Sequence, residues 1–99
     1  MIKIEVGTFY SGKSNELIRR GDYPAAMRRV LTAYYSYPED AYGKTISFFE
    51  CVLARAVSYE AHPHQPSSGY TLVGIFADED AIEIMLKFDK KCRTIKYEE

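Results

Sequence analysis

"YTLVGIFADED", residues 70–80, combines the two patterns around which the rest of the chain can be organised. Apolar residues occupy both faces of an extended chain over residues 70–77, which is typical of a strand in the middle of a sheet. Asp78 then opens a helical pattern with a single apolar face. That face consists of Ala81, Ile84, Met85 and Phe88. A central strand followed at once by a docked helix predicts a sheet covered by helices.

Both ends of the chain read as further strands. "IKIEV" (2–6) and "CRTIKY" (92–97) alternate apolar and polar residues, which is the period of a half-buried strand. Gly7 marks a turn or a bulge after the first of them, and "TFY" (8–10) continues the strand if a bulge forms. We therefore expect about three strands, at the two ends of the chain and at residues 70–77.

Three helices are expected between the first two of these strands. "NELIRR" (15–20) follows Ser14, a good N-cap, and closes at Gly21. Asp22 and Pro24 open the second helix, which ends near Pro38. Its buried stripe consists of Ala26, Met27, Val30, Leu31 and Tyr34. The third helix is expected over residues 45–60, with Ser47 and Glu50 as a capping box, and a polar loop over residues 61–69 follows it.

These elements define the expected fold. Their order is β-α-α-α-β-α-β in a single domain, residues 1–99. We predict a two-layer α/β (α+β) structure, with an about three-stranded sheet and helices packed on one face.

Composition narrows the classes of function. The chain has 46% apolar and 27% charged residues and a net charge of −1, as in an ordinary soluble globular protein without a strong field toward nucleic acid or anionic membranes. Lys3 and Glu5 interrupt any secretory signal, and no apolar run is long enough to span a bilayer. Cys51 and Cys92 lack metal-ligand spacing, and His62 and His64 lack further ligands nearby. We expect a cytoplasmic protein without a metal site, and neither nucleic acid nor membrane as its partner.

A second motif offers a phosphate site. "GTFYSGKS" (7–14) fits the phosphate-loop pattern G-x-x-x-x-G-K-[ST] at every fixed position. In that motif backbone N–H groups cradle phosphate oxygens, the lysine reaches the terminal phosphates and the hydroxyl binds magnesium. One hypothesis therefore assigns Gly7, Gly12, Lys13 and Ser14 to a Mg-nucleoside triphosphate or another phosphate ligand. The alternative is structural: a strand with a Gly7 bulge, a polar turn and a helix cap.

The same stretch carries a family resemblance. "FYSGKSNELIRR" (9–20) resembles the phosphate loop of the thymidine kinase family, where a similar stretch runs into a helix ending in paired arginines. The resemblance implies that Lys13 binds phosphate and Ser14 binds magnesium. "TLVGIFADED" (71–80) is similar to that family's second acidic motif, which implies that Asp78 or Glu79 lies near the metal.

A tyrosine-rich stretch offers a contact surface instead. "AYYSYPEDAY" (33–42) holds four of the nine tyrosines, and consecutive residues of a helix cannot all face one core. Tyrosine and arginine are enriched at interface hot spots. The predicted partner-binding residues are Arg28, Arg29, Tyr34, Tyr35 and Tyr37. The alternative is that the rings cover the core and the arginines form a solvated face.

The residues themselves support no catalytic assignment, because no acid–base pair, triad or metal set can be assembled from them. Residues 70–97, with the pattern F-x-x-E-D-A before a helix and a final strand, resemble small phage-encoded α/β proteins. The first hypothesis is a non-enzymatic protein, without cofactor, that binds another protein, as a phage-encoded inhibitor of a host defence system would. The second is the reduced phosphate-loop module described above. A homodimer is compatible with both, since a small sheet leaves two edges to cover.

Overall fold

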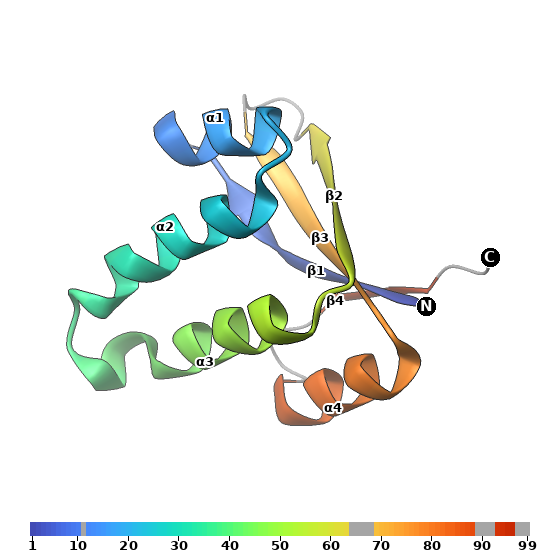
Figure 1. Cartoon of the computed structure of the whole chain (residues 1–99). Helices are drawn as coiled ribbons and strands as arrows, with labels where there is room; N and C mark the ends of the chain where they lie inside the picture. Colours follow the sequence, from blue (N-terminus) through green and yellow to red (C-terminus); the bar gives the residue numbers. More distant parts are fainter. Residues whose placement is uncertain (11, 64–68, 89–92, 97–99) are drawn as a thin grey trace.

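The computed structural model describes residues 1–10, 12–63, 69–88 and 93–96, and for Glu39 and residues 93–96 it describes the backbone. The elements in chain order are β1 (Ile2–Phe9), α1 (Gly12–Arg19), α2 (Tyr23–Tyr35), α3 (Glu39–Arg55), β2 (Ser58–Pro63), β3 (Tyr70–Phe76), α4 (Asp78–Phe88) and β4 (Arg93–Lys96). The strands form one sheet in the order β2-β3-β1-β4, and the helices pack on one of its faces (Figure 1). The predicted two-layer α+β class is confirmed. In the described ranges, no helix combines the length and apolar character that crossing a bilayer requires.

One strand, β2, was not predicted from the sequence. The expected elements are present in the expected order, and β2 is added between α3 and β3. The prediction of a helix over residues 45–60 followed by a loop was wrong at both ends. The helix begins at Glu39 and ends at Arg55, which places the supposed capping box inside it. The residues of β2 that pack against the core are Tyr59 and Ala61, both only half-buried, so this edge strand has a short and weak apolar alternation.

The central position of β3 is confirmed. It pairs antiparallel with β2 on one side and with β1 on the other. The register with β1 shifts between Glu5 and Gly7, so that Val6 is an extra residue on β1. The predicted bulge at Gly7 and the continuation of the strand beyond it are therefore confirmed. The bulge changes which residues face the helices, because it lets Phe9 point to the same face as Ile4 and Val6.

The predicted start of α2 and the predicted end of α1 are confirmed, but the predicted start of α1 is not. The Ala25 N–H donates to the Asp22 carboxylate at 3.4 Å, which confirms the cap of α2. After α1, the N–H of Gly21 donates to the Ile18 carbonyl at 3.0 Å and closes the helix. The prediction of Ser14 as an N-cap was wrong, because α1 already begins at Gly12.

The core lies between the helices and one face of the sheet. Ala26, Met27, Val52, Phe76 and Ile84 contribute to it with an exposed fraction of 0%. Val73 and Ile75 point to the other sheet face and are nevertheless 1% and 8% exposed. That face of the sheet is therefore also covered.

The cover includes an ion pair that reaches across β3. Lys3 on β1 and Glu60 on β2 flank β3, and their charged groups meet at 2.7 Å. The Glu60 carboxylate also lies 3.1 Å from His62 Nε2. The aliphatic stem of Lys3 thus lies over the central strand while its ammonium is paired.

Stability is expected to depend on this pair only above the carboxyl pKa. The hydrogen bond from Lys3, and then His62, hold the pKa of Glu60 below its usual 4.5, against the effect of burial. A lowered folded-state pKa contributes stability that is complete above the usual pKa and is lost as pH falls through the folded value. Lys3→Met should therefore lower the free energy of unfolding by up to about 1 kcal/mol near neutral pH, and this loss should become smaller in acid. Urea unfolding at several pH values measures this; a loss that does not change with pH would contradict it.

Candidate functional site

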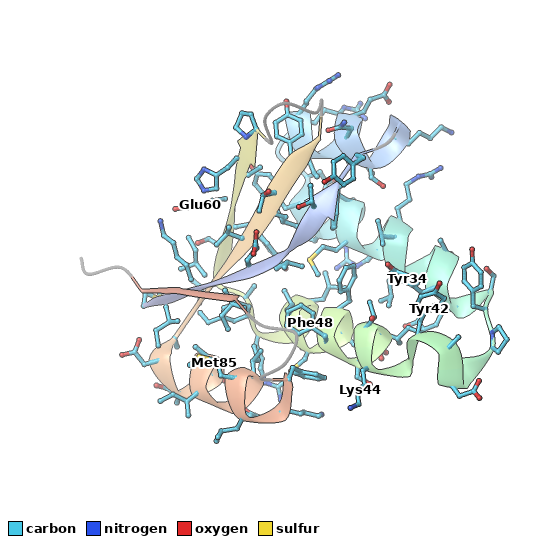
Figure 2. All side chains as sticks on the ribbon, turned by 180° about the vertical axis from the view of Figure 1, so that it is seen from behind. Tyr34, Tyr42, Lys44, Phe48, Glu60 and Met85 are labelled. Atoms are coloured by element: carbon cyan, nitrogen blue, oxygen red, sulfur yellow. The ribbon has the colours of Figure 1, made fainter. Side chains whose placement is uncertain are left out.

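The predicted contact tyrosines gather where α2 meets α3. Tyr35 and Tyr37 are each 54% exposed, and Tyr42, which follows on α3, is 37% exposed. Tyr34 is half-buried and faces inward. We call these four residues the aromatic corner. Figure 2 shows Tyr34 and Tyr42 next to one another at this junction.

The rings of the corner support one another. The Tyr42 ring lies 4.9 Å from the Tyr34 ring and 5.0 Å from the Tyr37 ring, measured between centroids. Tyr34 meets the buried Phe49 edge-on at 6.1 Å. Tyr42 has non-helical backbone angles, φ −130° and ψ 21°, and this kink in α3 occurs at the residue that contacts both other tyrosines. Tyr42 was in the quoted tyrosine stretch but not among the predicted contact residues; the kink that places it there leaves no sequence signature.

Tyr35 is held on the opposite side of the corner. Its hydroxyl donates to Glu50 of α3 at 3.2 Å. Desolvation raises the pKa of Tyr35, and the neighbouring Glu50 carboxylate raises it further. The phenol therefore stays protonated and remains a hydrogen-bond donor. The contact ties the last turn of α2 to α3, while half of the ring stays accessible.

The two arginines are exposed but lie in different surroundings. Arg28 is close to Tyr59 of β2: burial raises the pKa of Tyr59, and the Arg28 guanidinium partly opposes that rise. Arg29 lines a groove between α1 and α2 together with Tyr34 and Tyr37, and Arg28 reaches the same groove. The structure thus brings all five predicted contact residues to α2 and the turn after it, with Arg28 extending toward the sheet.

Tyr37 separates two depressions of the surface. On one side is the groove that holds the arginines. On the other, Tyr35 and Tyr37 line a hollow with Ile46, Ser47 and Glu50 of α3. The Tyr37 ring therefore projects between a basic surface and one that contains a carboxylate.

Residues 7–14 have a different geometry from that of a phosphate loop. Gly7, Thr8 and Phe9 are strand residues that pair with β3, so the first half of the motif lies in the sheet. Gly12 has a φ of 48°, a left-handed conformation that glycine adopts without strain, at the first residue of α1. Lys13 is exposed. Ser14 is 8% exposed and lies against the molecule's interior.

The acidic motif lies at the other end of the sheet. β1 and β3 are antiparallel, so the end of β1 that leads to Lys13 meets the beginning of β3 at Tyr70. Asp78 follows the far end of β3 and pairs with the N-terminal ammonium of Met1 at 3.1 Å. Asp78 and Glu79 therefore cannot share a metal ion with Ser14, as the family resemblance implied. Across the described ranges, no three His, Cys, Asp or Glu side chains are grouped to hold a metal ion.

Comparisons of the chain with protein-family models, with curated proteins and with solved structures found no match.

Proposed function

We propose that the protein acts by binding another protein through the aromatic corner and Arg29. The observation that carries this proposal is the exposure of Tyr35 and Tyr37, each 54%, on a support of packed rings and helix contacts. A tyrosine offers a large contact area and a hydroxyl, while few torsions have to be fixed on binding. These properties are the reason that tyrosine and arginine dominate interface hot spots.

Pre-organisation strengthens the argument. Tyr37 rests edge-on against Tyr42, and its backbone N–H donates to the Tyr34 carbonyl at 3.1 Å. Side chains that are already ordered lose less entropy when a partner binds. The corner is therefore suited to contact a concave partner surface, with Tyr37 projecting and Arg29 available for a carboxylate.

The phosphate-ligand hypothesis receives less support from the geometry. Its loop residues Gly7–Phe9 pair with β3, and the Ser14 side chain lies in the interior instead of at an exposed anion site. An inhibitor role against a host defence system, which the resemblance to phage proteins implied, remains a prediction within the protein-binding proposal. It depends on which partner is identified.

The test is capture of the partner from a lysate of the source organism, followed by titration of the identified protein. Tyr37→Ala should weaken binding about 30-fold, the loss expected for a hot-spot residue. Leu86→Ala is the control, because Leu86 is 81% exposed on α4, away from the corner. Its affinity should equal that of the parent.

Thermal unfolding of both variants checks that the fold is retained. If a folded Tyr37→Ala variant, and likewise Tyr35→Ala and Arg29→Ala, bound the partner with parental affinity, the corner would not be the contact surface.

A further inference from the structure

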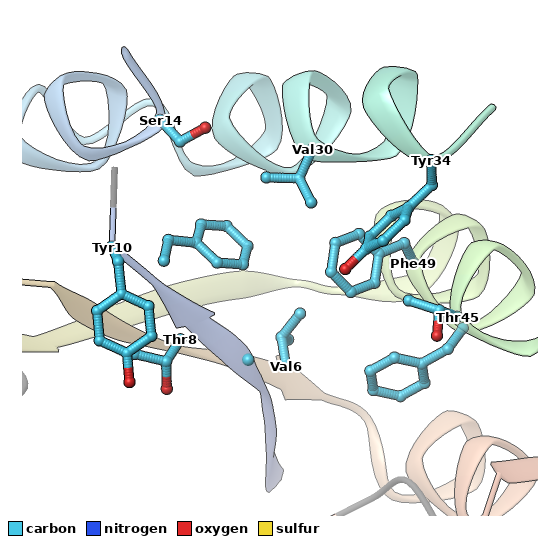
Figure 3. A pocket seen from close by; sticks show the side chains of 11 residues that line it. Val6, Thr8, Tyr10, Ser14, Val30, Tyr34, Thr45 and Phe49 are labelled. Carbon is cyan, nitrogen blue, oxygen red and sulfur yellow. The ribbon is translucent and has the colours of Figure 1, made fainter. Parts of the chain in front are cut away.

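A cavity of about 470 Å³ lies on the inner side of α1 and α2, next to the second half of β1 (Figure 3). Residues of all three N-terminal helices and of β1 line it. They include Val6, Phe9, Ser14, Val30, Tyr34 and Thr45. The volume falls in the range of small-molecule sites in proteins, roughly 300–1,000 Å³.

Two hydroxyls at this cavity are available to a ligand. Figure 3 shows the Tyr34 hydroxyl pointing into the space between α2, α3 and β1. Ser14 lines the same space from α1 and is 8% exposed, so more than nine-tenths of it is buried. Within the described part of the chain, neither hydroxyl has a protein hydrogen-bond partner. Neither hydroxyl oxygen is fully enclosed by protein, so each can bond to a molecule that enters the cavity.

The rest of the lining determines the chemistry of that molecule. Phe9, Phe48 and Phe49 supply aromatic walls, and Val6 and Val30 supply aliphatic ones. None of the described lining residues carries a charged side chain. A charged ligand would lose its hydration without gaining a counter-charge from these residues. An aromatic ligand would instead contact the edges and faces of the phenylalanine rings. The hydroxyls of the lining can both donate hydrogen bonds to a polar group of the ligand and accept them from it.

We propose that this cavity binds a small uncharged aromatic molecule whose amide or hydroxyl group bonds to Ser14 and Tyr34. The inference goes beyond the protein-binding proposal and needs no partner protein, although Tyr34 belongs both to the aromatic corner and to the cavity lining. It also gives Ser14, a residue of the phosphate-loop pattern, a role in ligand binding without phosphate.

Three probes of similar size and different charge test the proposal: benzamide, benzoate and benzylammonium. Titrations of the full-length protein are followed by NMR through the backbone amides of Ser14, Val30 and Tyr34. Benzamide should produce saturable shifts at these residues with millimolar affinity, whereas both charged probes should bind at least about tenfold more weakly. Ser14→Ala should weaken benzamide binding about fivefold, the usual effect of one lost hydrogen bond.

A variant whose side chain fills the cavity provides a second test of the proposal. Val30→Phe places a ring in the cavity and should abolish binding, whereas Val57→Phe adds the same ring at a 60% exposed position and should not change it. Absence of saturable shifts with benzamide up to its solubility limit would overturn the proposal. Equal binding of the three probes would do so as well, and so would undiminished binding by Ser14→Ala, which keeps the test decisive even if Val30→Phe does not fold.

Discussion

Phe49→Ala is expected to destabilise the protein by about 3–5 kcal/mol, as truncation of a buried aromatic residue does. Phe49 is 5% exposed and lies where the aromatic side chains of four elements meet. Its ring is 6.3 Å from Phe9 of β1, 6.1 Å from Tyr34 of α2 and 6.2 Å from Phe48 of α3. Phe48 in turn meets Phe88 of α4 at 5.5 Å.

The expected loss of stability is large because neighbouring side chains cannot fill the space that the Phe49 ring leaves. Phe49 already borders the cavity between α2, α3 and β1, so removal of its ring enlarges an existing space. The loss includes the burial of the ring and the packing of three aromatic neighbours. For a domain of this size the melting temperature should fall by roughly 15–30 °C.

Thermal and urea unfolding measure this effect, with Phe49→Leu as the matched variant. Leucine keeps most of the buried apolar volume, so its cost should be well below half of that of alanine. If Phe49→Ala unfolded within about 1 kcal/mol of the parent, the aromatic side chains would not form a connected core.

Gly69→Ala is the second substitution with a large expected effect. It should lower the free energy of unfolding by about 3 kcal/mol, near the upper end of the cost of overpacking. Gly69 precedes β3 and is buried against the end of β1. A Cβ atom at this position would lie 2.8 Å from the Phe9 carbonyl oxygen and 3.3 Å from the Tyr10 Cα. Both are backbone atoms, so a side-chain rotation cannot relieve the contact. The strand end would have to separate from β1.

Gly43→Ala is the control with the opposite expected sign. A Cβ atom at Gly43 has no neighbour within 4 Å, and the residue lies inside α3. Alanine is the better helix former, so this variant should gain up to about 1 kcal/mol. Urea unfolding of the two variants side by side provides the comparison. Equal effects of the two substitutions would show that β1 and Gly69 do not approach as closely as described.

Much of the candidate surface could be predicted from the sequence, because exposure on a helix follows its period. Consecutive tyrosines after Ala33 had to point in different directions, and Tyr35 and Tyr37 are indeed exposed. Tyr34 was placed in the buried stripe of α2 and also among the contact residues, and the structure shows it half-buried. The role of Tyr42 required the kink in α3, which depends on how α3 packs against α2.

The phosphate-loop pattern shows the limit of a local motif. Its letters are typical of a strand followed by a helix, and both are present as β1 and α1. The magnesium-nucleotide site that the resemblance implied also requires that the glycine-rich turn be free of the sheet and that the acidic residues near the metal lie at the same sheet end. The antiparallel pairing of β1 with β3 decides the second condition, and it places Asp78 at the far end.

By itself, the sequence determined the features that depend on neighbours in the chain. Apolar period identified β1, β3, α2 and α4, and Asp22 and Gly21 marked helix ends, because caps and amphipathic faces act within a few residues. Only the tertiary structure decided the strand β2, the direction of β3 against β1 and the cavity behind Ser14. Each of these depends on contacts between residues far apart in the chain. Backbone hydrogen bonds make β2 a strand only once β3 lies beside it, and a cavity exists only once three helices and a strand surround it.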